Sequence, residues 1–328
     1  MKSVFLLILL LVLLPNQVLA APGPTQVNLF QVTTDGGQQK DALIYNNQIA
    51  YTNFSGSQGI DIWGYNIVDG INFPIIERAG QQFITGFFGN LIVYEDVDNL
   101  SNYDVRLYNM RDGEDILIAG GPGAQGSGVT NGKYVVYING GACGSIHAYN
   151  LRTDVDTIIS PTACHPLRIS DDTVIWPNGA AGGTNIYGYD LRRDLPLDIV
   201  IEDNFQESPN IFHNKIVWLH YITGAPGDYN AIKFKDLKTG EEKTIYESST
   251  TSLQWPAVSN RYVVWSESSA QHVNGIKAAD LKTGEVFEVQ PQGPHQNSHT
   301  MPSIWRNTAT WVSFRTGNGD IYMASFDK

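Results

Sequence analysis

The stretch Asn214-Lys215-Ile216-Val217-Trp218 decides the fold, because its pattern of two β-branched residues and an aromatic residue recurs along the chain. The aromatic residues of the copies stand at positions 51, 94, 137, 176, 218, 265 and 311, and 39 to 47 residues separate each from the next. Clear copies include Val135-Val136-Tyr137 and Val263-Val264-Trp265. Short β-branched runs at such a period indicate a chain built from repeated units.

Each repeat can be divided into four expected strands. Strand A, for example Pro209 to Phe212, precedes a tight turn, and the β-branched run forms strand B. Strand C carries Ile or Val with Asp or Asn four residues later, as in Ile186 with Asp190. The best copies of a short outer strand D are Leu237-Lys238-Thr239-Gly240 and Leu281-Lys282-Thr283-Gly284. Such four-stranded repeats are typical of the blades of a β-propeller.

The two ends of the chain are expected to complete one blade together. Residues 302–304, 310–312 and 321–326 supply strands A, B and C of the last repeat, and Val27 to Thr33 is an alternating strand that no other repeat claims. We therefore expect an all-β, seven-bladed β-propeller of four-stranded antiparallel blades. In its last blade the N-terminal strand joins three C-terminal strands and closes the ring.

The first twenty residues have the features of a secretory signal peptide. Lys2 supplies a positive charge, Val4 to Leu14 is apolar, and Val18-Leu19-Ala20 precedes the expected cleavage between Ala20 and Ala21. We expect residues 1–20 to be removed and residues 21–328 to form a single propeller domain. The protein would then be periplasmic, secreted or on the cell surface, without membrane insertion.

The formal net charge of −12 restricts the partners. An acidic chain without a basic stripe is unsuited to nucleic acid and to anionic membranes. The expected partner is a protein or a glycan on the cell surface or in the periplasm.

The two cysteines are expected on one face of the ring. In the predicted strand order, the B–C loops and the D-to-A crossings lie on one face, called here the loop-rich face, and the tight A–B and C–D turns lie on the other. Cys143 falls in a B–C loop and Cys164 in the following crossing. An exported chain permits a disulfide between them that closes about 20 residues, and two free thiols are the alternative.

The repeat resembles the TolB-like β-propeller repeat of bacterial and archaeal exported and cell-surface proteins. The closest matches are Asn185-Ile186-Tyr187-Gly188-Tyr189-Asp190-Leu191 and Asp61-Ile62-Trp63-Gly64-Tyr65-Asn66. The resemblance covers nearly all of residues 21–328. It implies the propeller fold but no single activity, because this superfamily includes protein-docking scaffolds, peptidase gating domains and some polysaccharide lyases.

A polar residue recurs twelve positions before the anchor aromatic, where the crossing into strand A is expected. Such a ring of amides and imidazoles can bond the backbone of an adjacent blade, or it can bind a ligand at the mouth of the central channel. Where Cys164 or Leu253 holds the position, His165 or Gln254 is adjacent. The predicted rim residues are Gln39, Gln82, Gln125, His165, Gln206, Gln254, Trp255 and His299.

Two segments are candidates for metal binding, although no cofactor is required by the pattern. His295, Gln296 and His299 could hold a divalent metal such as manganese. Oligogalacturonate lyases, which are distantly similar propellers, have a His and Gln metal site at such a place, but Met301 stands here where a further His is expected. Glu95 to Asn99 offers oxygen ligands for calcium, and a simple acidic loop is its alternative interpretation.

These patterns favour a non-catalytic binding or interaction module that presents its loop-rich face to a protein or glycan. Trp255 and Tyr229 are the expected aromatic anchors. The alternative is a metal-dependent polysaccharide lyase of the oligogalacturonate type that uses the His and Gln site. A structural surface-layer component is the third class.

Overall fold

The structure is a computed structural model that describes residues 25–55, 59–99, 102–141, 143–180, 183–222, 229–269, 272–291, 301–314 and 317–327. Within these ranges every regular element is a β-strand, from β1 (Gln26–Gln31) to β28 (Asp320–Asp327). No helix of the described ranges is long and apolar enough to span a membrane. The expected all-β class is confirmed, and the expected signal peptide lies outside the described residues.

The strands form four-stranded antiparallel units from consecutive segments of the chain. The first two units are β2 (Gln39–Tyr45), β3 (Gln48–Asn53), β4 (Gly59–Asn66) and β5 (Ile71–Ile76), and β6 (Gly80–Phe88), β7 (Leu91–Asn99), β8 (Asn102–Asn109) and β9 (Asp115–Ala119). Next come β10 (Gln125–Thr130), β11 (Tyr134–Asn139), β12 (Cys143–Asn150) and β13 (Val155–Cys164), and β14 (Arg168–Ser170), β15 (Thr173–Ala180), β16 (Gly183–Asp190) and β17 (Leu195–Val200). They are followed by β18 (Asn204–Phe212), β19 (Lys215–Ile222), β20 (Tyr229–Asp236) and β21 (Glu242–Ser248), and by β22 (Ser252–Val258), β23 (Tyr262–Ser269), β24 (His272–Asp280) and β25 (Val286–Gln290). The last unit contains β26 (Ser303–Trp305), β27 (Thr308–Ser313), β28 and β1.

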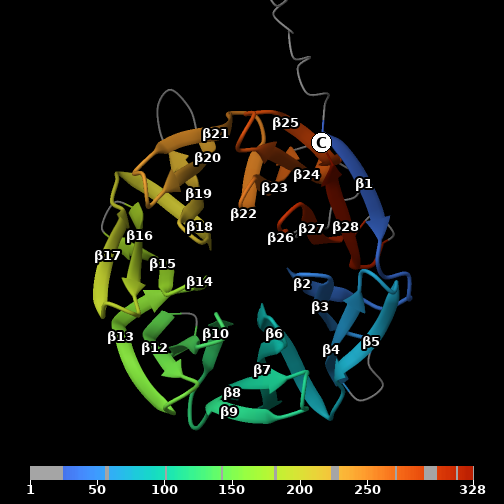
Figure 1. The fold of residues 1–328 in the computed structure, drawn as a ribbon, viewed down its shortest axis with the longest axis vertical. Coiled ribbons are helices and arrows are strands. Elements are labelled where there is room, and N and C mark those ends of the chain that lie inside the picture. The colour runs from blue at the N-terminus through green and yellow to red at the C-terminus, as the bar shows by residue number, and fades with distance from the viewer. Residues whose placement is uncertain are drawn as a thin grey trace, which may run out of the picture.

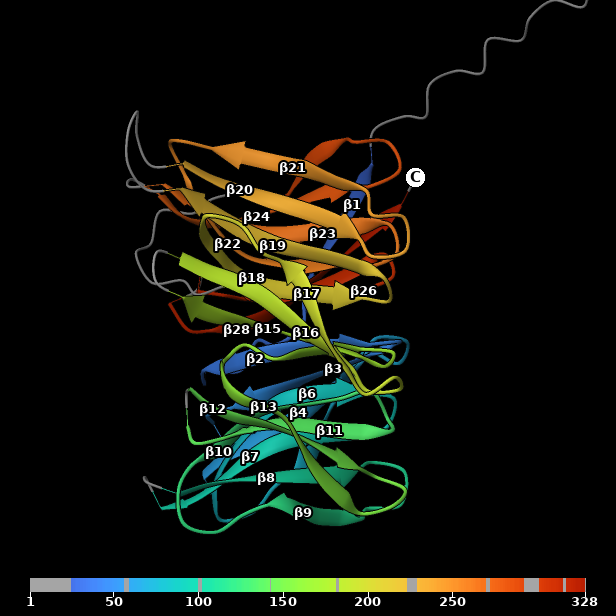
Figure 2. The same ribbon diagram turned by 90° about the vertical axis from the view of Figure 1, so that its left-hand side faces the viewer.

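The units stand around a central space (Figure 1). The first strand of each unit, such as β2, β6 or β10, is innermost, and β5, β9, β13 and their equivalents are outermost. From the side, the strands run from one face of the ring to the other (Figure 2). Short parallel contacts, Gly59 with Gly80 and Gly183 with Asn204, join two pairs of units into eight-stranded sheets.

The N-terminal strand pairs with the C-terminal strands. All six residues of β1 pair antiparallel with β28, from Gln26 opposite Asp327 to Gln31 opposite Tyr322. Beyond β1, the Val32 amide donates to the Ile321 carbonyl at 2.8 Å. The expected combination of one N-terminal and three C-terminal strands is therefore present.

The anchor aromatics form the core between units. Trp218 packs against Ile175 and Ile186 of the preceding unit, and Trp265 likewise packs against Val217. The same relation links the two ends of the chain, because Tyr51 of the first unit shares a buried cluster with Val312 and Ile321 of the last. The repeated β-branched and aromatic pattern thus packs each unit on its neighbour.

Two local expectations were wrong. Leu237 to Gly240 and Leu281 to Gly284 are hairpin turns, and the outer strands β21 and β25 begin after them. Asp236 stabilises the first turn, since its Oδ1 accepts from the amides of Lys238 and Thr239, and Gly240 has φ +75°. Five of the innermost strands, β2, β6, β10, β18 and β22, also start earlier than expected, because a β-bulge lengthens them; Gln39 is the first residue of β2.

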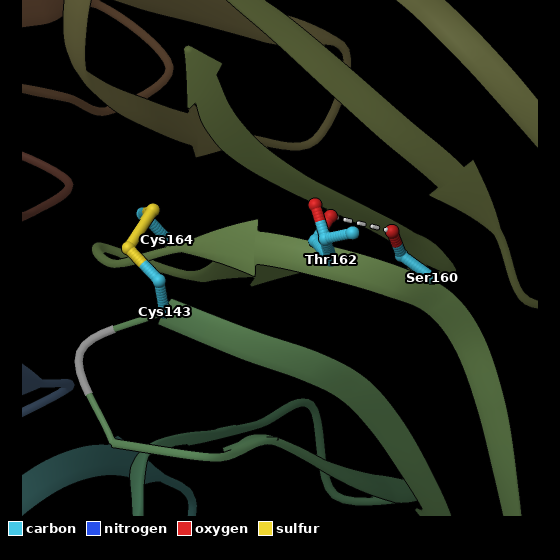
Figure 3. Close-up of a disulfide and its surroundings, with 4 residues drawn as sticks. All are labelled: Cys143, Ser160, Thr162 and Cys164. Atoms are coloured by element: carbon cyan, nitrogen blue, oxygen red, sulfur yellow. Dashed lines mark hydrogen bonds between the residues drawn. A yellow bond between two sulfur atoms is a disulfide. The ribbon is translucent and has the colours of Figure 1, made fainter.

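A disulfide joins Cys143 to Cys164 (Figure 3). The two residues lie directly opposite each other at the ends of β12 and β13, with 4.1 Å between their Cα atoms. The expected pairing is confirmed, whereas their expected positions in a loop and a crossing were wrong, because both strands extend to include them.

Replacing both cysteines with serine should lower the free energy of unfolding by about 3 kcal/mol, because the bond closes a loop of 21 residues in the unfolded chain. Chemical denaturation of the wild type and the variant, each with and without reductant, measures this difference. Reductant should remove the difference, and equal stabilities without reductant would contradict the prediction.

Candidate binding face and central cavity

Four of the predicted rim glutamines are buried. Gln39, Gln82 and Gln206 are 0% exposed and Gln125 is 5% exposed. They lie on the innermost strands, not in the crossings as expected, and their side chains point into the protein. A ligand contact for these glutamines stays a prediction.

The amides of these glutamines bond groups near them in the chain. Gln206 Nε2 donates to the Asp203 carbonyl at 2.9 Å and lies 3.2 Å from His220 Nδ1. Gln82 bonds Ala79 and Asp96 in the same way. For Gln82, Gln125 and Gln206 one partner is fourteen residues later, opposite the glutamine on the next strand, and Asn139 fills this place for Gln125. Gln39 differs, because its Nε2 donates to Asp35 Oδ2 and to the Gly37 carbonyl. This second period was present in the sequence and would have indicated a structural role.

The other predicted rim residues have different surroundings. His165 is exposed, and Gln254 and Trp255 are partly exposed on β22. Trp255 has φ +52°, which is an outlier for a bulky residue. Three residues at the same position of the bulge also have positive φ, namely Asp41, Ser127 and Ser208. His299, with the predicted metal ligands His295 and Gln296, lies outside the described residues.

The second predicted anchor, Tyr229, lies beside the strand of Trp255. Asn230, its neighbour on β20, accepts from the Leu253 amide of β22 at 2.7 Å. The Tyr229 hydroxyl donates to Glu247 Oε2 at 2.6 Å, and burial together with this contact raises the pKa of Tyr229 to about 12. The structure thus brings the elements of both predicted anchors together at the loop-rich ends of the strands.

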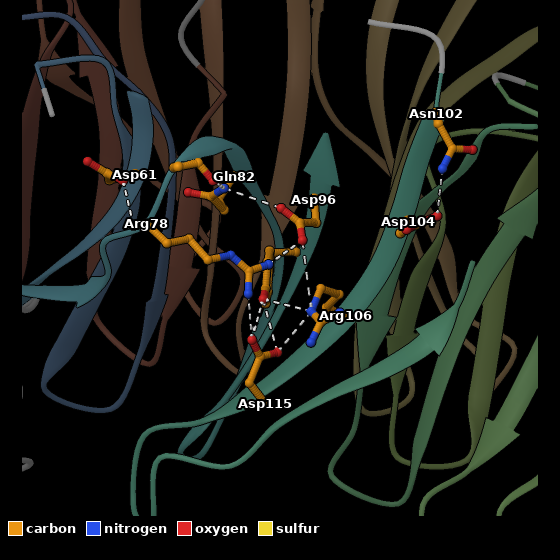
Figure 4. Close-up of polar contacts among 10 residues, drawn as sticks. Asp61, Arg78, Gln82, Asp96, Asn102, Asp104, Arg106 and Asp115 are labelled. Atoms are coloured by element: carbon orange, nitrogen blue, oxygen red, sulfur yellow. Dashed lines mark hydrogen bonds and ion pairs between the residues drawn. The ribbon is translucent and has the colours of Figure 1, made fainter. Parts of the chain in front are cut away.

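The segment considered for calcium is part of strand β7 and is not a loop. Asp96 pairs with Arg78, and Arg78 Nη1 donates to Asp115 Oδ2 at 2.9 Å (Figure 4). Arg106 Nε lies 3.2 Å from Asp115 Oδ1 and 3.1 Å from the Tyr94 hydroxyl. Because these two arginines and two aspartates satisfy one another, the network is structural, and the expected acidic loop was wrong. No group of three His, Cys, Asp or Glu residues in the described ranges could hold a metal ion.

A cavity of about 290 Å³ occupies the centre of the ring, and every innermost strand contributes to its lining. The apolar part of the wall includes Leu43, Val129, Ile169 and Ala257. Asp41 and Arg168 are its charged residues among those described. Ligand pockets of proteins have this character, with apolar walls and few polar groups.

Aromatic rings gather at the tight-turn end of the innermost strands. Tyr45 and Trp305, which end β2 and β26, have ring centroids 4.2 Å apart, and Tyr45 and Phe88 are 4.8 Å apart. Phe212 of β18 lies 5.5 Å from Trp305, although the unit of β22 stands between theirs in the ring order. We call these four residues the aromatic floor, because they meet across the axis of the ring.

Arg168 was not identified from the sequence. It is the first residue of β14, and its Nη1 donates to the neighbouring Leu167 carbonyl at 2.8 Å. Burial among the innermost strands lowers the pKa of Arg168 to about 10, so the side chain is charged at neutral pH. A signal was available: alignment of the repeats on their anchor aromatics places Leu43, Val129 and Ala257 at the same position. Arg168 is the charged residue at this aligned position, and the residues at this position line the cavity.

Glu95 connects two units near the cavity. Its Oε1 accepts from the Ser127 amide at 2.8 Å, and Gly126 leaves the space, because a Cβ there would lie 2.6 Å from Oε1. Burial raises the pKa of the Glu95 carboxyl, the Ser127 amide lowers it, and the nearby Asp41 raises it further. The net shift is upward, so ionised Glu95 reduces the stability of the folded chain.

Glu95→Gln should therefore stabilise the protein at pH 7 and leave its stability unchanged near pH 3.5. Below the ordinary glutamate pKa of about 4.3 the carboxyl is protonated in the folded and the unfolded chain, so Glu95 causes no loss of stability there. The loss appears as the pH rises through the raised pKa of Glu95 in the folded chain. Thermal melts across this range test it, with the exposed Glu114→Gln as control. A destabilised Glu95→Gln variant at pH 7 would contradict the sign.

Comparisons with known proteins identify the fold. No protein-family model matches the chain, and no curated protein matches its sequence. Among solved structures, an oligogalacturonate lyase in complex with manganese matches at 13% identity over 93% of this chain and 97% of that chain, with a TM-score of 0.67. A prolyl endopeptidase matches at 14% identity over 90% and 50%, with a TM-score of 0.62, and the tricorn protease at 15% over 84% and 29%, with a TM-score of 0.51. The chain shares the propeller fold of these proteins, and at such identities the likeness extends to the fold alone.

Proposed function

We propose that this chain is an exported, seven-bladed, TolB-like β-propeller that acts as a non-catalytic binding module. Residues 21–328 form its single domain once residues 1–20 are removed. The pairing of β1 with β28 and the core between the first and last units support a closed ring. The disulfide between Cys143 and Cys164 is compatible with export.

The conformation of Trp255 carries the binding proposal. The bulge of the innermost strand imposes a positive φ, which Asp41 and Ser127 accommodate with small polar side chains. A tryptophan there costs on the order of 1–3 kcal/mol, and its side chain is still partly exposed instead of filling the core. Strain of this kind is typical of residues placed for contact with a ligand or partner.

The partner is a protein or a glycan, and both classes are bound through aromatic residues with a polar rim. Trp255 supplies a large apolar surface, and Tyr229 lies on the adjoining element with its hydroxyl held by Glu247. The protonated Tyr229 keeps an apolar ring with one polar end, which suits a partly wet interface.

Alanine replacement of Trp255 should weaken partner binding about 30-fold, because a buried tryptophan anchor contributes about 2 kcal/mol or more. The exposed Glu207, on β18 of the same ring, is the matched control, and Glu207→Ala should change affinity less than about twofold. A glycan array and an array of cell-envelope proteins would be probed with the purified chain and both variants.

Equal losses in the two variants would contradict the binding face. The alternative function, a metal-dependent lyase acting on uronate polymers through His295, Gln296 and His299, gives a different outcome. Unsaturated uronate products would then accumulate when the chain is supplied with manganese and an oligogalacturonate, and His299→Ala would abolish them.

A further inference from the structure

We propose that the central cavity is a second binding site, which takes a small organic monocarboxylate through an ion pair with Arg168. This site is separate from the surface of Trp255, and the inference goes beyond the proposed function. It rests on the position of one cation, Arg168, in a cavity whose wall is partly apolar.

Arg168 differs from the other partly buried arginines of the chain. Arg78 and Arg106 lie 2.9 Å and 3.2 Å from Asp115 oxygens, and Arg261 Nη2 lies 2.8 Å from Asp280 Oδ2. Arg168 makes no ion pair with any described residue, and its hydrogen bond goes to its own neighbour, Leu167. Removing a cation from water without a counter-ion is costly. Binding of an anion beside Arg168 is therefore favoured.

The other polar groups of the lining are already engaged. Thr130 Oγ1 donates to the Tyr134 carbonyl at 2.7 Å, Asn210 Oδ1 accepts from the Val258 amide at 3.1 Å, and Ser303 Oγ accepts from the Ile44 amide at 3.3 Å. The remaining charged group, Asp41, bonds the Thr52 hydroxyl. Thr85 Oγ1 likewise donates to the Val93 carbonyl at 3.3 Å. Arg168 is the cationic group of the described lining, and so the group that an anion would meet.

The chemistry of the cavity selects the ligand. The planar guanidinium matches the two oxygens of a carboxylate. One cation neutralises one negative charge, and the chain as a whole has a net charge of −12, which disfavours a dianion such as phosphate. The apolar wall and the ring of Phe212 at the floor favour an apolar body behind the carboxylate. A volume of about 290 Å³ suits a small acid or the last residue of a peptide.

The aromatic floor lies at the tight-turn end, so we expect the ligand to enter from the loop-rich end. Met301, which precedes β26 at that end, lines the cavity and is 38% exposed. A free organic acid and the carboxyl terminus of a peptide present the same chemistry to Arg168, and the experiment distinguishes these sources.

Calorimetric titration with hexanoate, and with an N-acetylated alanine tripeptide that has a free carboxyl terminus, tests the proposal. Each acid should bind at least about tenfold more tightly than its carboxamide, the value expected for a charge-assisted pair. Arg168→Gln should remove about the same factor, and Arg168→Lys should retain part of the affinity. Arg152→Gln removes an exposed charge and should change affinity less than about twofold.

A second measurement separates a binding role from a structural one. Arg168→Gln should melt at a higher temperature than the wild type without ligand, because it removes a desolvated cation, whereas loss of a structural arginine lowers the melting temperature. Binding of either acid with the stated dependence on Arg168 supports the proposal, and the tighter acid identifies the source. It is overturned if neither acid binds at millimolar concentration, if the carboxamides bind equally well, or if Arg168→Gln binds like the wild type.

Discussion

A chain that begins at Thr33, and so lacks β1, should lose cooperative folding and aggregate. All six residues of β1 pair with β28, and Val27 packs on the core of the last unit. Without them β28 becomes an exposed strand edge, which pairs readily with other chains. We expect the free energy of unfolding to fall by on the order of 3 kcal/mol or more.

Thermal melts and light scattering would compare this chain with one that begins at Thr25. Adding a synthetic peptide of residues 25–32 should restore part of the melting temperature, because the missing strand can pair from solution. Equal melting temperatures for the two chains would contradict the closing role of β1.

Trp218→Ala should destabilise the protein by about 3–5 kcal/mol, the range for removing a fully buried aromatic side chain. Trp218 is 0% exposed and packs on Ile175, Ile186 and Ile199 of the preceding unit, so its loss opens a cavity between units. Because this contact joins two neighbouring units, the loss should appear as lowered stability of the folded chain in urea.

A comparison of two phenylalanine variants separates packing from hydrogen bonding. Trp311 Nε1 donates to Gln290 Oε1, whereas Trp218 Nε1 has no partner among the described residues. Trp311→Phe leaves a buried oxygen without this donor and should cost about 1 kcal/mol more than Trp218→Phe. Equal losses in urea denaturation would show that the Trp311 hydrogen bond contributes no net stability.

The fold could be predicted because its physical cause is periodic. The β-branched pairs before Tyr94, Trp218 and Trp265 form the second strand of their units, and each aromatic fills the same interface between neighbours. The unclaimed segment at 27–33 identified the closing strand for the same reason. Periodicity alone did not fix where strands end, and the turns at 237–240 were assigned to strands.

The sites were less predictable, since function departs from the repeat. Gln39, Gln82, Gln125 and Gln206 follow the period and are buried. Trp255 and Arg168 depart from the repeat. Trp255 is a bulky residue at a strained bulge. Arg168 is a charged residue at the position that Leu43 and Val129 hold in their own repeats. The sequence could suggest Trp255, but only the central cavity gives Arg168 a role.

The central claim is that the chain binds a partner and does not act as a metal-dependent lyase. The metal content of the purified mature protein, dialysed without chelator and measured beside His299→Ala, tests it most directly. The binding account predicts that neither protein retains a stoichiometric transition metal. About one equivalent in the wild type that is lost in the variant would contradict the account and identify His299 as a ligand.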